Sequence, residues 1–303
     1  MPEKGVRSTY SQCPFELQMY DEQGMIATGS AFFFEINDEW FLITNWHNVS
    51  GKHFLENRPL LNGRFPTRLV AKLSSYDIED SPEGSFGIVP FDVSIYQNDE
   101  PLWLEHPELS SRCDVIALPL QRPASCPEFM HNAVNRISGA RIPVEPGGTV
   151  FIVGFPRSIS VGFGLPLWKS GYIASEPHYD ITIGGKPRQF GGLSGGIKLP
   201  AFFLDSQTRE GMSGSPVFAS YFGTWDTVDP YSRLGPDDPG FWERDDVFLG
   251  SKAIEFVGCY SGRIGPEEEG AALGMCWRKD VIEKICIAKK RGRHPHINYA
   301  SPI

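Results

Sequence analysis

The segment Gly211–Phe218 (GMSGSPVF) places one serine, Ser213, between two glycines and ahead of an apolar run. Glycine on both sides lets the backbone turn tightly, so that the serine Oγ projects outward as a nucleophile must. The same turn can direct backbone N–H groups at one point, where they would stabilise the oxyanion of an acyl-transfer reaction. The pattern therefore predicts Ser213 as a nucleophile, with Gly211, Met212 and Ser213 forming the oxyanion hole.

A nucleophilic serine needs a base, and the base needs an acid that orients it. The run 41–49 (FLITNWHNV) is an apolar stretch that ends in His47, and the run 112–120 (RCDVIALPL) opens an apolar stretch with Asp114. Asp92 also opens an apolar stretch and is the alternative acid, but its stretch is shorter. The spacing predicts His47 as base and Asp114 as its orienting partner, in the chain order His, Asp, Ser.

A second serine has a comparable local context. Ser194 lies in Gly192-Leu193-Ser194-Gly195-Gly196, which also fits the nucleophile turn of α/β-hydrolases. That fold places its acid and histidine after the serine, and the only histidines after Ser194 are His294 and His296, in a polar basic tail. We interpret this stretch as a glycine-rich hairpin or loop.

The elements that must position these residues are short strands. The chain of 303 residues contains 32 Gly and 25 Pro, and its apolar runs are brief and broken by turn residues. This pattern favours an all-β fold over an alternating α/β one. Two domains are expected, 1–135 with the histidine and aspartate and 136–303 with the serine. A C-terminal helix is expected at about 279–290, followed by a basic, mobile tail.

The motifs and their order resemble the chymotrypsin-like serine proteases, in particular the bacterial trypsin-like peptidases without a PDZ domain. Besides the three catalytic contexts, the resemblance rests on the runs 29–35 (GSAFFFE), 153–156 (VGFP), 256–262 (FVGCYSG) and 274–277 (GMCW). It implies two antiparallel six-stranded β-barrels with a C-terminal α-helix and the active site in the cleft between the barrels. It also implies a serine endopeptidase that forms an acyl-enzyme on Ser213 and acts on polypeptides.

The same resemblance suggests the residues that bind substrate. Gln207 stands where the trypsin branch carries the aspartate that selects Lys or Arg, so a tryptic preference is not expected. Thr208 matches the glutamyl endopeptidases, whereas Tyr260 replaces their histidine. A pocket edged by Gln207, Thr208, Tyr260, Ser261 and Gly262 would take a polar or medium-sized residue.

Composition excludes several other classes of function. The net charge of −9 argues against a nucleic-acid partner. None of the six cysteines forms a C-x-x-C pair, so no metal and no other cofactor is expected. The chain opens on polar residues and has no apolar run long enough to cross a membrane, which predicts a cytoplasmic protein with free thiols.

The sequence leaves the regulation of the protein open, and it allows two functions other than peptide hydrolysis. Met212 occupies the place of the aspartate that activates trypsin-like zymogens, so we expect narrow specificity, or a protein partner that orders residues 209–212, to limit activity. The acidic segment 224–247 is interpreted as a solvated surface excursion, with a lid or exosite as the alternative. A catalytically silent binding module and a serine esterase are the alternatives to an endopeptidase.

Overall fold

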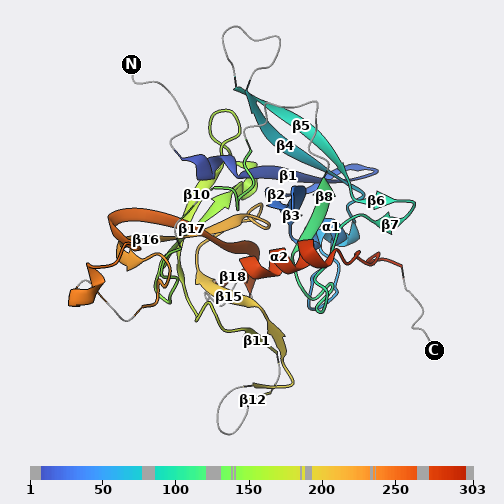
Figure 1. The fold of residues 1–303 in the computed structure, drawn as a ribbon. Helices are drawn as coiled ribbons and strands as arrows, with labels where there is room; N and C mark the ends of the chain where they lie inside the picture. The colour runs from blue at the N-terminus through green and yellow to red at the C-terminus, as the bar shows by residue number, and fades with distance from the viewer. Residues whose placement is uncertain are drawn as a thin grey trace.

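The strands of the chain gather into two bodies, with the C-terminal helix between them (Figure 1). The computed structural model describes residues 8–76, 86–120, 131–137, 139, 141–184, 186–187, 193–232, 235, 237–264 and 273–297. The all-β fold with a C-terminal helix is confirmed.

The N-terminal body is one antiparallel six-stranded sheet in the order β5-β4-β1-β2-β3-β8. Its strands are β1 (Pro14–Asp21), β2 (Gly24–Ile36), β3 (Glu39–Thr44), β4 (Arg68–Tyr76), β5 (Phe86–Ser94) and β8 (Ile116–Leu120). The five-residue helix α1 (Trp46–Ser50) follows β3, and the short ribbon β6 (Tyr96–Gln97) and β7 (Glu100–Pro101) lies beside the sheet. Apolar residues that alternate along these strands, such as Phe15, Leu17 and Met19 of β1, form the core of this body.

The C-terminal body is a closed six-stranded barrel in the order β10-β15-β18-β17-β16-β9. Its strands are β9 (Thr149–Gly154), β10 (Leu167–Ile173), β15 (Ala201–Asp205), β16 (Pro216–Asp226), β17 (Val247–Ile264) and β18 (Leu273–Arg278). Two short ribbons extend from it: β11 (Ile181–Ile183) with β14 (Ile197–Leu199), and β12 (Lys186–Pro187) with β13 (Leu193–Ser194). Closure leaves no free edge strand in the barrel and fixes the position of the turn before β16, which carries Ser213.

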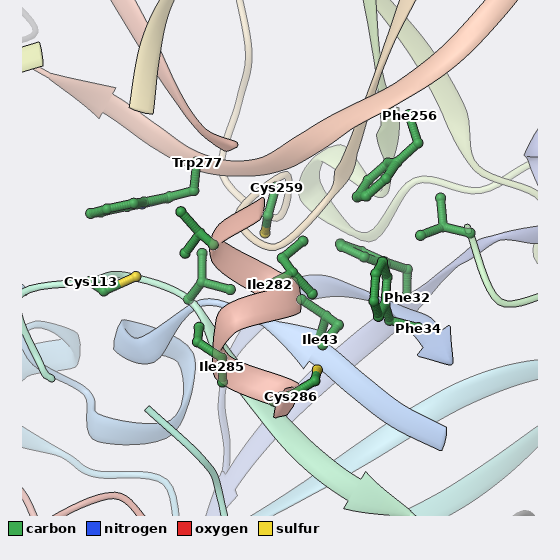
Figure 2. Close-up of a cluster of buried hydrophobic side chains, with 14 of the residues drawn as sticks. Phe32, Phe34, Ile43, Cys113, Phe256, Cys259, Trp277, Ile282, Ile285 and Cys286 are labelled. Atoms are coloured by element: carbon green, nitrogen blue, oxygen red, sulfur yellow. The ribbon is translucent and has the colours of Figure 1, made fainter. Parts of the chain in front are cut away.

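Helix α2 (Lys279–Ala288) joins the two bodies through its apolar face. Figure 2 shows Ile282, Ile285 and Cys286 of α2 close to Phe32, Phe34 and Ile43 of the N-terminal sheet and to Trp277 of the barrel. All of these side chains belong to one buried cluster. The burial of one continuous cluster by both bodies and the helix holds the two bodies at a fixed separation.

The tail expected to be mobile, residues 291–296, instead packs against the N-terminal body. Gly292 N donates to the Trp103 carbonyl at 2.9 Å, and Lys52 Nζ donates to the Pro295 carbonyl at 2.7 Å. The His296 ring lies 3.6 Å from the Phe65 ring, centroid to centroid. These contacts are with residues far away in sequence, which is why the polar composition of the tail gave no sign of them.

The acidic segment 224–247 is mostly the loop that joins β16 to β17, since β16 ends at Asp226 and β17 begins at Val247. Asp226 is buried and forms an ion pair with Arg244, and Phe241 is also buried. The segment is therefore only partly a solvated excursion. Of its described residues, Pro230 and Tyr231 line a cavity on the barrel with His178 and Arg278, away from the cleft described below.

Candidate active site

His47 is positioned by the turn between β3 and α1. The strand ends at Thr44, the helix begins at Trp46, and Gly51 ends it in the left-handed conformation at φ 67°. Asn45, fully buried between strand and helix, donates from Nδ2 to the Asp114 carbonyl at 2.7 Å. His47 thus lies in the first turn of a helix whose entry is fixed to the segment that carries the aspartate.

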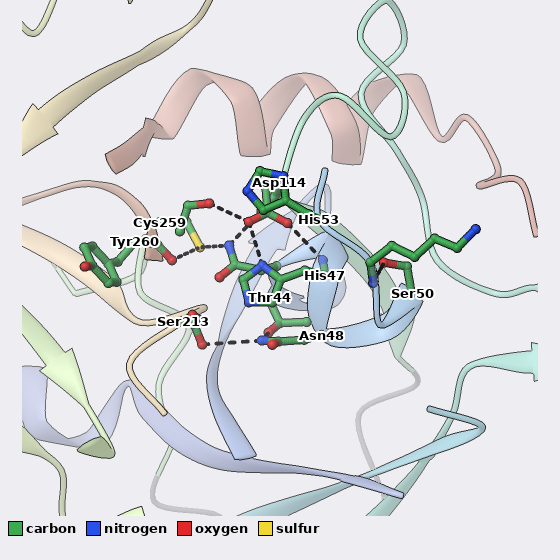
Figure 3. A network of polar contacts seen from close by, with 12 residues as sticks. Thr44, His47, Asn48, Ser50, His53, Asp114, Ser213, Cys259 and Tyr260 are labelled. Carbon is green, nitrogen blue, oxygen red and sulfur yellow. Dashed lines mark hydrogen bonds and ion pairs between the residues drawn. The ribbon is translucent and has the colours of Figure 1, made fainter. Parts of the chain in front are cut away.

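Asp114 holds His47 by two bonds, and its carboxylate is 1% exposed. One oxygen accepts from the His47 backbone N at 2.9 Å, and the other lies 2.7 Å from His47 Nδ1 (Figure 3). Ser261 Oγ donates to the second oxygen at 2.5 Å. A carboxylate at Nδ1 places the imidazole proton there, so Nε2 is left as an acceptor able to take a proton. Asp92, the alternative acid, is in β5, with an exposed side chain paired with Arg68.

Ser213 lies in a tight turn between Gly211 at φ 89° and Gly214 at φ 87°. Its carbonyl accepts from Asn48 Nδ2 at 3.4 Å (Figure 3). It also accepts from Ser30 N at 2.8 Å, so the turn is tied to the N-terminal body. Ser213, His47 and Asp114 line one cavity of about 550 Å³. Within the part of the chain that the structure describes, no hydrogen bond joins Ser213 Oγ to His47 Nε2. Such bonds are often long in unliganded sites and shorten when substrate binds.

The turn before Ser213 presents two backbone donors. Met212 N donates to the Arg209 carbonyl at 3.3 Å, and the Glu210 carbonyl accepts from Arg157 N at 2.7 Å. Because the carbonyl and N–H of a trans peptide point in opposite directions, the Gly211 N–H is directed away from Arg157. Neither Gly211 N nor Ser213 N donates to any acceptor among the described residues. The structure thus leaves these two N–H groups available for an oxyanion, whereas Met212, expected as a third member, uses its N–H inside the turn.

Ser30 supports this turn, and sequence reasoning missed it. Its side chain is fully buried, and Oγ donates to the Gly211 carbonyl at 2.8 Å while accepting from Phe155 N at 3.2 Å. A Cβ on Gly211 would lie 2.3 Å from the Phe155 carbonyl, so only glycine fits there. Ser30 was recognised only as part of a strand motif, and no local pattern indicates a bond to a residue 181 positions away.

The residues expected to bind substrate divide into three groups. Gln207 is exposed. Thr208 and Tyr260 are each 1% exposed and hydrogen-bonded to each other, and burial raises the pKa of Tyr260. Ser261 Oγ donates a hydrogen bond to Asp114. Gly262 lies beside the serine, since a Cβ on it would lie 3.7 Å from Ser213 Oγ. The expected pocket is therefore filled on its inner side by the threonine and tyrosine.

Ser194 belongs to a different part of the fold. It is in β13, where its backbone pairs with Lys186 of β12, while Gly192 of its motif lies outside the described residues. The structure does not describe the Ser194 side chain. What distinguishes Ser213 is the arrangement around it, with a paired histidine and aspartate lining the same cavity.

The described residues offer no other obvious reactive centre. They contain no group of three or more His, Cys, Asp and Glu side chains placed to hold a metal ion. Five cysteines are free and buried, and burial raises the pKa of the Cys113, Cys259 and Cys276 thiols well above the usual range; Cys126 lies outside the described residues. No helix in the described ranges is long and apolar enough to cross a membrane.

Comparison with known proteins finds similarity among solved structures. No family model and no curated protein sequence matches the chain. The active form of the Rv3671c protease from M. tuberculosis is similar at 13% identity and a TM-score of 0.44, over 94% of this chain and 83% of that one. The serine endoprotease from Yersinia pestis (11%, TM-score 0.43, 94% and 67%) and the HtrA-type protease AlgW with tripeptide (11%, TM-score 0.44, 92% and 60%) are also similar. These three solved structures are thus described as a protease, a serine endoprotease and an HtrA-type protease.

Proposed function

We propose that this chain is a serine endopeptidase with Ser213 as nucleophile, His47 as base and Asp114 as the acid that orients the base. The observation that carries the proposal is the bonding of Asp114, which accepts from both the backbone and the ring of His47 and from Ser261, in the cavity that Ser213 also lines. A buried, three-bonded carboxylate beside a histidine and a serine on a glycine turn is an arrangement for acyl transfer.

The roles follow from the geometry. His47 Nε2 takes the proton of Ser213 Oγ as that oxygen attacks the substrate carbonyl, and Nε2 later protonates the leaving amine. Asp114 keeps the proton on Nδ1 and stabilises the imidazolium that forms. The N–H groups of Gly211 and Ser213 stabilise the oxyanion. A water molecule, deprotonated by His47, then attacks the acyl-enzyme on Ser213 and releases the acyl group as a carboxylic acid.

The geometry of the turn formed by residues 209–214, the oxyanion turn, supports activity of the isolated protein. The Glu210–Gly211 peptide is held by Arg157 N, which donates to the Glu210 carbonyl, and the next peptide, Gly211–Met212, is held by Ser30 Oγ, which donates to the Gly211 carbonyl. An activating partner is therefore not needed to orient the Gly211 N–H, and narrow specificity becomes the favoured limit on activity. We also propose residence in a reducing compartment, the cytoplasm, since the five described cysteines are free.

A fluorophosphonate probe tests the site directly. Wild type, Ser213→Ala and Ser194→Ala would be treated with the probe, and the labelled peptide would be located by mass spectrometry. Labelling of Ser213 that is lost only in Ser213→Ala is expected. Label on Ser194 would contradict the assignment, and absence of label would point to a silent binding module.

Substrate class needs a second measurement. The same preparations would be incubated with a broad peptide mixture and with activated esters. Cleavage of peptide bonds that Ser213→Ala abolishes would support the endopeptidase. Turnover of esters with no cleavage of any peptide would favour the serine esterase instead.

A further inference from the structure

A second groove leads away from the catalytic residues along β2. It has a volume of about 890 Å³ and shares His47, Leu60 and Ser213 with the first cavity, but it extends beside Gly211 and residues 25–28 rather than beside Ser261 and Gly262. Of the residues assigned to the expected specificity pocket, Ser261 and Gly262 line the first cavity and none lines the second groove. The second groove would therefore hold the leaving-group half of a bound polypeptide.

One wall of this groove is apolar and open. Met25 and Ile26 of β2 line it together with Leu60 and Leu61 of the loop after α1, and Met25 is 53% exposed. Leu61 has a left-handed backbone at φ 50°, which is uncommon for a side chain of this size. Exposed apolar side chains and a strained backbone both cost free energy, and strain of this kind concentrates at ligand sites. The opposite rim is polar, with Arg157, Ser158 and Glu210.

The backbone of β2 can hold an extended chain in the groove. Ser30 N donates to the Ser213 carbonyl, so at Ser30 the backbone N–H points away from β1. In an antiparallel pair the direction alternates from one residue to the next, so the N–H and carbonyl of Thr28 point to the same side as those of Ser30. Thr28 lines the groove, and β3 pairs with β2 only from Phe32 onward. A substrate strand can add at this edge.

The branch on the other side lacks a comparable apolar receptor at its inner end. Thr208 and Tyr260 are buried against each other, and a Cβ on Gly274 would lie 2.7 Å from the Tyr260 ring, so the ring packs directly on that glycine. The open part of that branch carries charged side chains, including Glu56, Arg58 and Arg263. Phe54, Leu55 and Met275 also line that branch, so the second groove is distinguished by its exposed wall and by the edge of β2 rather than by apolar character alone.

We propose that this enzyme selects its substrates on the leaving-group side, taking polypeptides with a large apolar residue at one of the first two positions after the scissile bond. The inference rests on the proposed endopeptidase function. Side chains of an extended strand alternate between two faces, so one of the two positions meets the Met25 and Leu61 wall while the other meets the polar rim.

Cleavage-site profiling tests the proposal. Wild type would digest a library of peptides of diverse sequence, and the cleaved bonds would be identified by mass spectrometry. We expect Leu, Ile, Met or Phe to be enriched by about tenfold at one of the two positions after the bond, the discrimination typical of a hydrophobic pocket, with weaker selection before it.

The double variant Met25→Thr/Leu61→Asn replaces two apolar side chains of the wall by polar ones. Thr is well suited to the strand at position 25, and Asn tolerates the left-handed backbone at position 61. Its profile should lose most of the enrichment after the bond and keep the pattern before it. The matched control is Phe222→Thr, another exposed apolar residue on a strand, which should keep the wild-type profile. Fluorophosphonate labelling measured alongside shows whether Ser213 remains assembled in each variant.

The possible failures are distinguishable. If wild type is labelled by the probe but cleaves no peptide, the endopeptidase function fails and this inference fails with it. If wild type cleaves peptides without apolar enrichment after the bond, or with strong selection only before it, the inference alone is wrong. An unchanged profile in the double variant would also overturn it.

Discussion

Replacing Ser30 with alanine tests whether the oxyanion turn is held in place by the N-terminal body. The Ser30 hydroxyl is the bridge between the Gly211 carbonyl, at 2.8 Å, and Phe155 N, at 3.2 Å. In Ser30→Ala both backbone groups lose their partner in a fully buried position. The turn can then relieve the cost by rotating the peptides around Gly211, which would move the N–H that serves the oxyanion.

The expected size follows from the two lost bonds. Leaving one buried donor or acceptor unpaired costs about 1–3 kcal/mol, so the free energy of unfolding should fall by about 2–5 kcal/mol, depending on how far water replaces the hydroxyl. If 1–3 kcal/mol of this loss reaches the transition state, kcat falls by about 5- to 150-fold. Complete loss of one oxyanion donor would cost on the order of 100- to 1000-fold, which sets the upper bound.

The assay measures kcat and KM on a cleaved peptide, the rate of fluorophosphonate labelling, and stability by urea unfolding. Ser74→Ala is the matched control, because Ser74 is also buried and donates from Oγ to a distant carbonyl, that of Phe163, at 3.1 Å. We expect both variants to lose stability and only Ser30→Ala to lose kcat, with KM little changed. If Ser30→Ala keeps kcat within about twofold of wild type while it loses stability like Ser74→Ala, the reasoning about the turn is refuted.

Three further predictions concern other parts of the structure. Ser261→Ala removes the third bond to Asp114, worth about 1.5–3 kcal/mol for a charged acceptor, so kcat/KM on a peptide should fall by at least about tenfold and urea unfolding should show a loss of stability of up to that size. His131 is buried and its pKa is lowered from 6.5 to about 4, so the folded state resists its protonation; the free energy of unfolding should fall by about 3 kcal/mol as pH drops from about 6.5 to about 4, and a His131→Gln variant followed by urea unfolding should lack that part of the pH dependence. Truncation after Lys290 removes the backbone N–H that the buried Glu105 carboxylate accepts from the tail, and should lower the unfolding midpoint; an unchanged midpoint would show that the tail contributes nothing to stability.

The architecture and the reactive residue types were predictable because each depends on a pattern of residues close together in the sequence. Short apolar runs broken by glycine and proline indicated an all-β chain, and the helix expected at about 279–290 is observed at Lys279–Ala288. The glycines around Ser213 indicated a tight turn, and both flanking glycines do have positive φ. The sequence also favoured Asp114 over Asp92, and the contact with His47 supports that choice.

The rest depended on contacts between segments far apart in the chain. Ser30 meets Gly211 only because the two bodies pack together, and the polar tail is ordered only because it lies on residues such as Phe65 and Lys52 of the N-terminal body. The filling of the expected pocket by Tyr260 follows from the packing of its ring on Gly274 in the neighbouring strand. The sequence specifies which side chains are present. The burial of each side chain and the direction of each peptide N–H depend on the segments that pack around it. By itself, therefore, the sequence determined the fold class and the residue types of the candidate site, and the tertiary structure decided how the turn at Ser213 is supported and where the open grooves beside it lie.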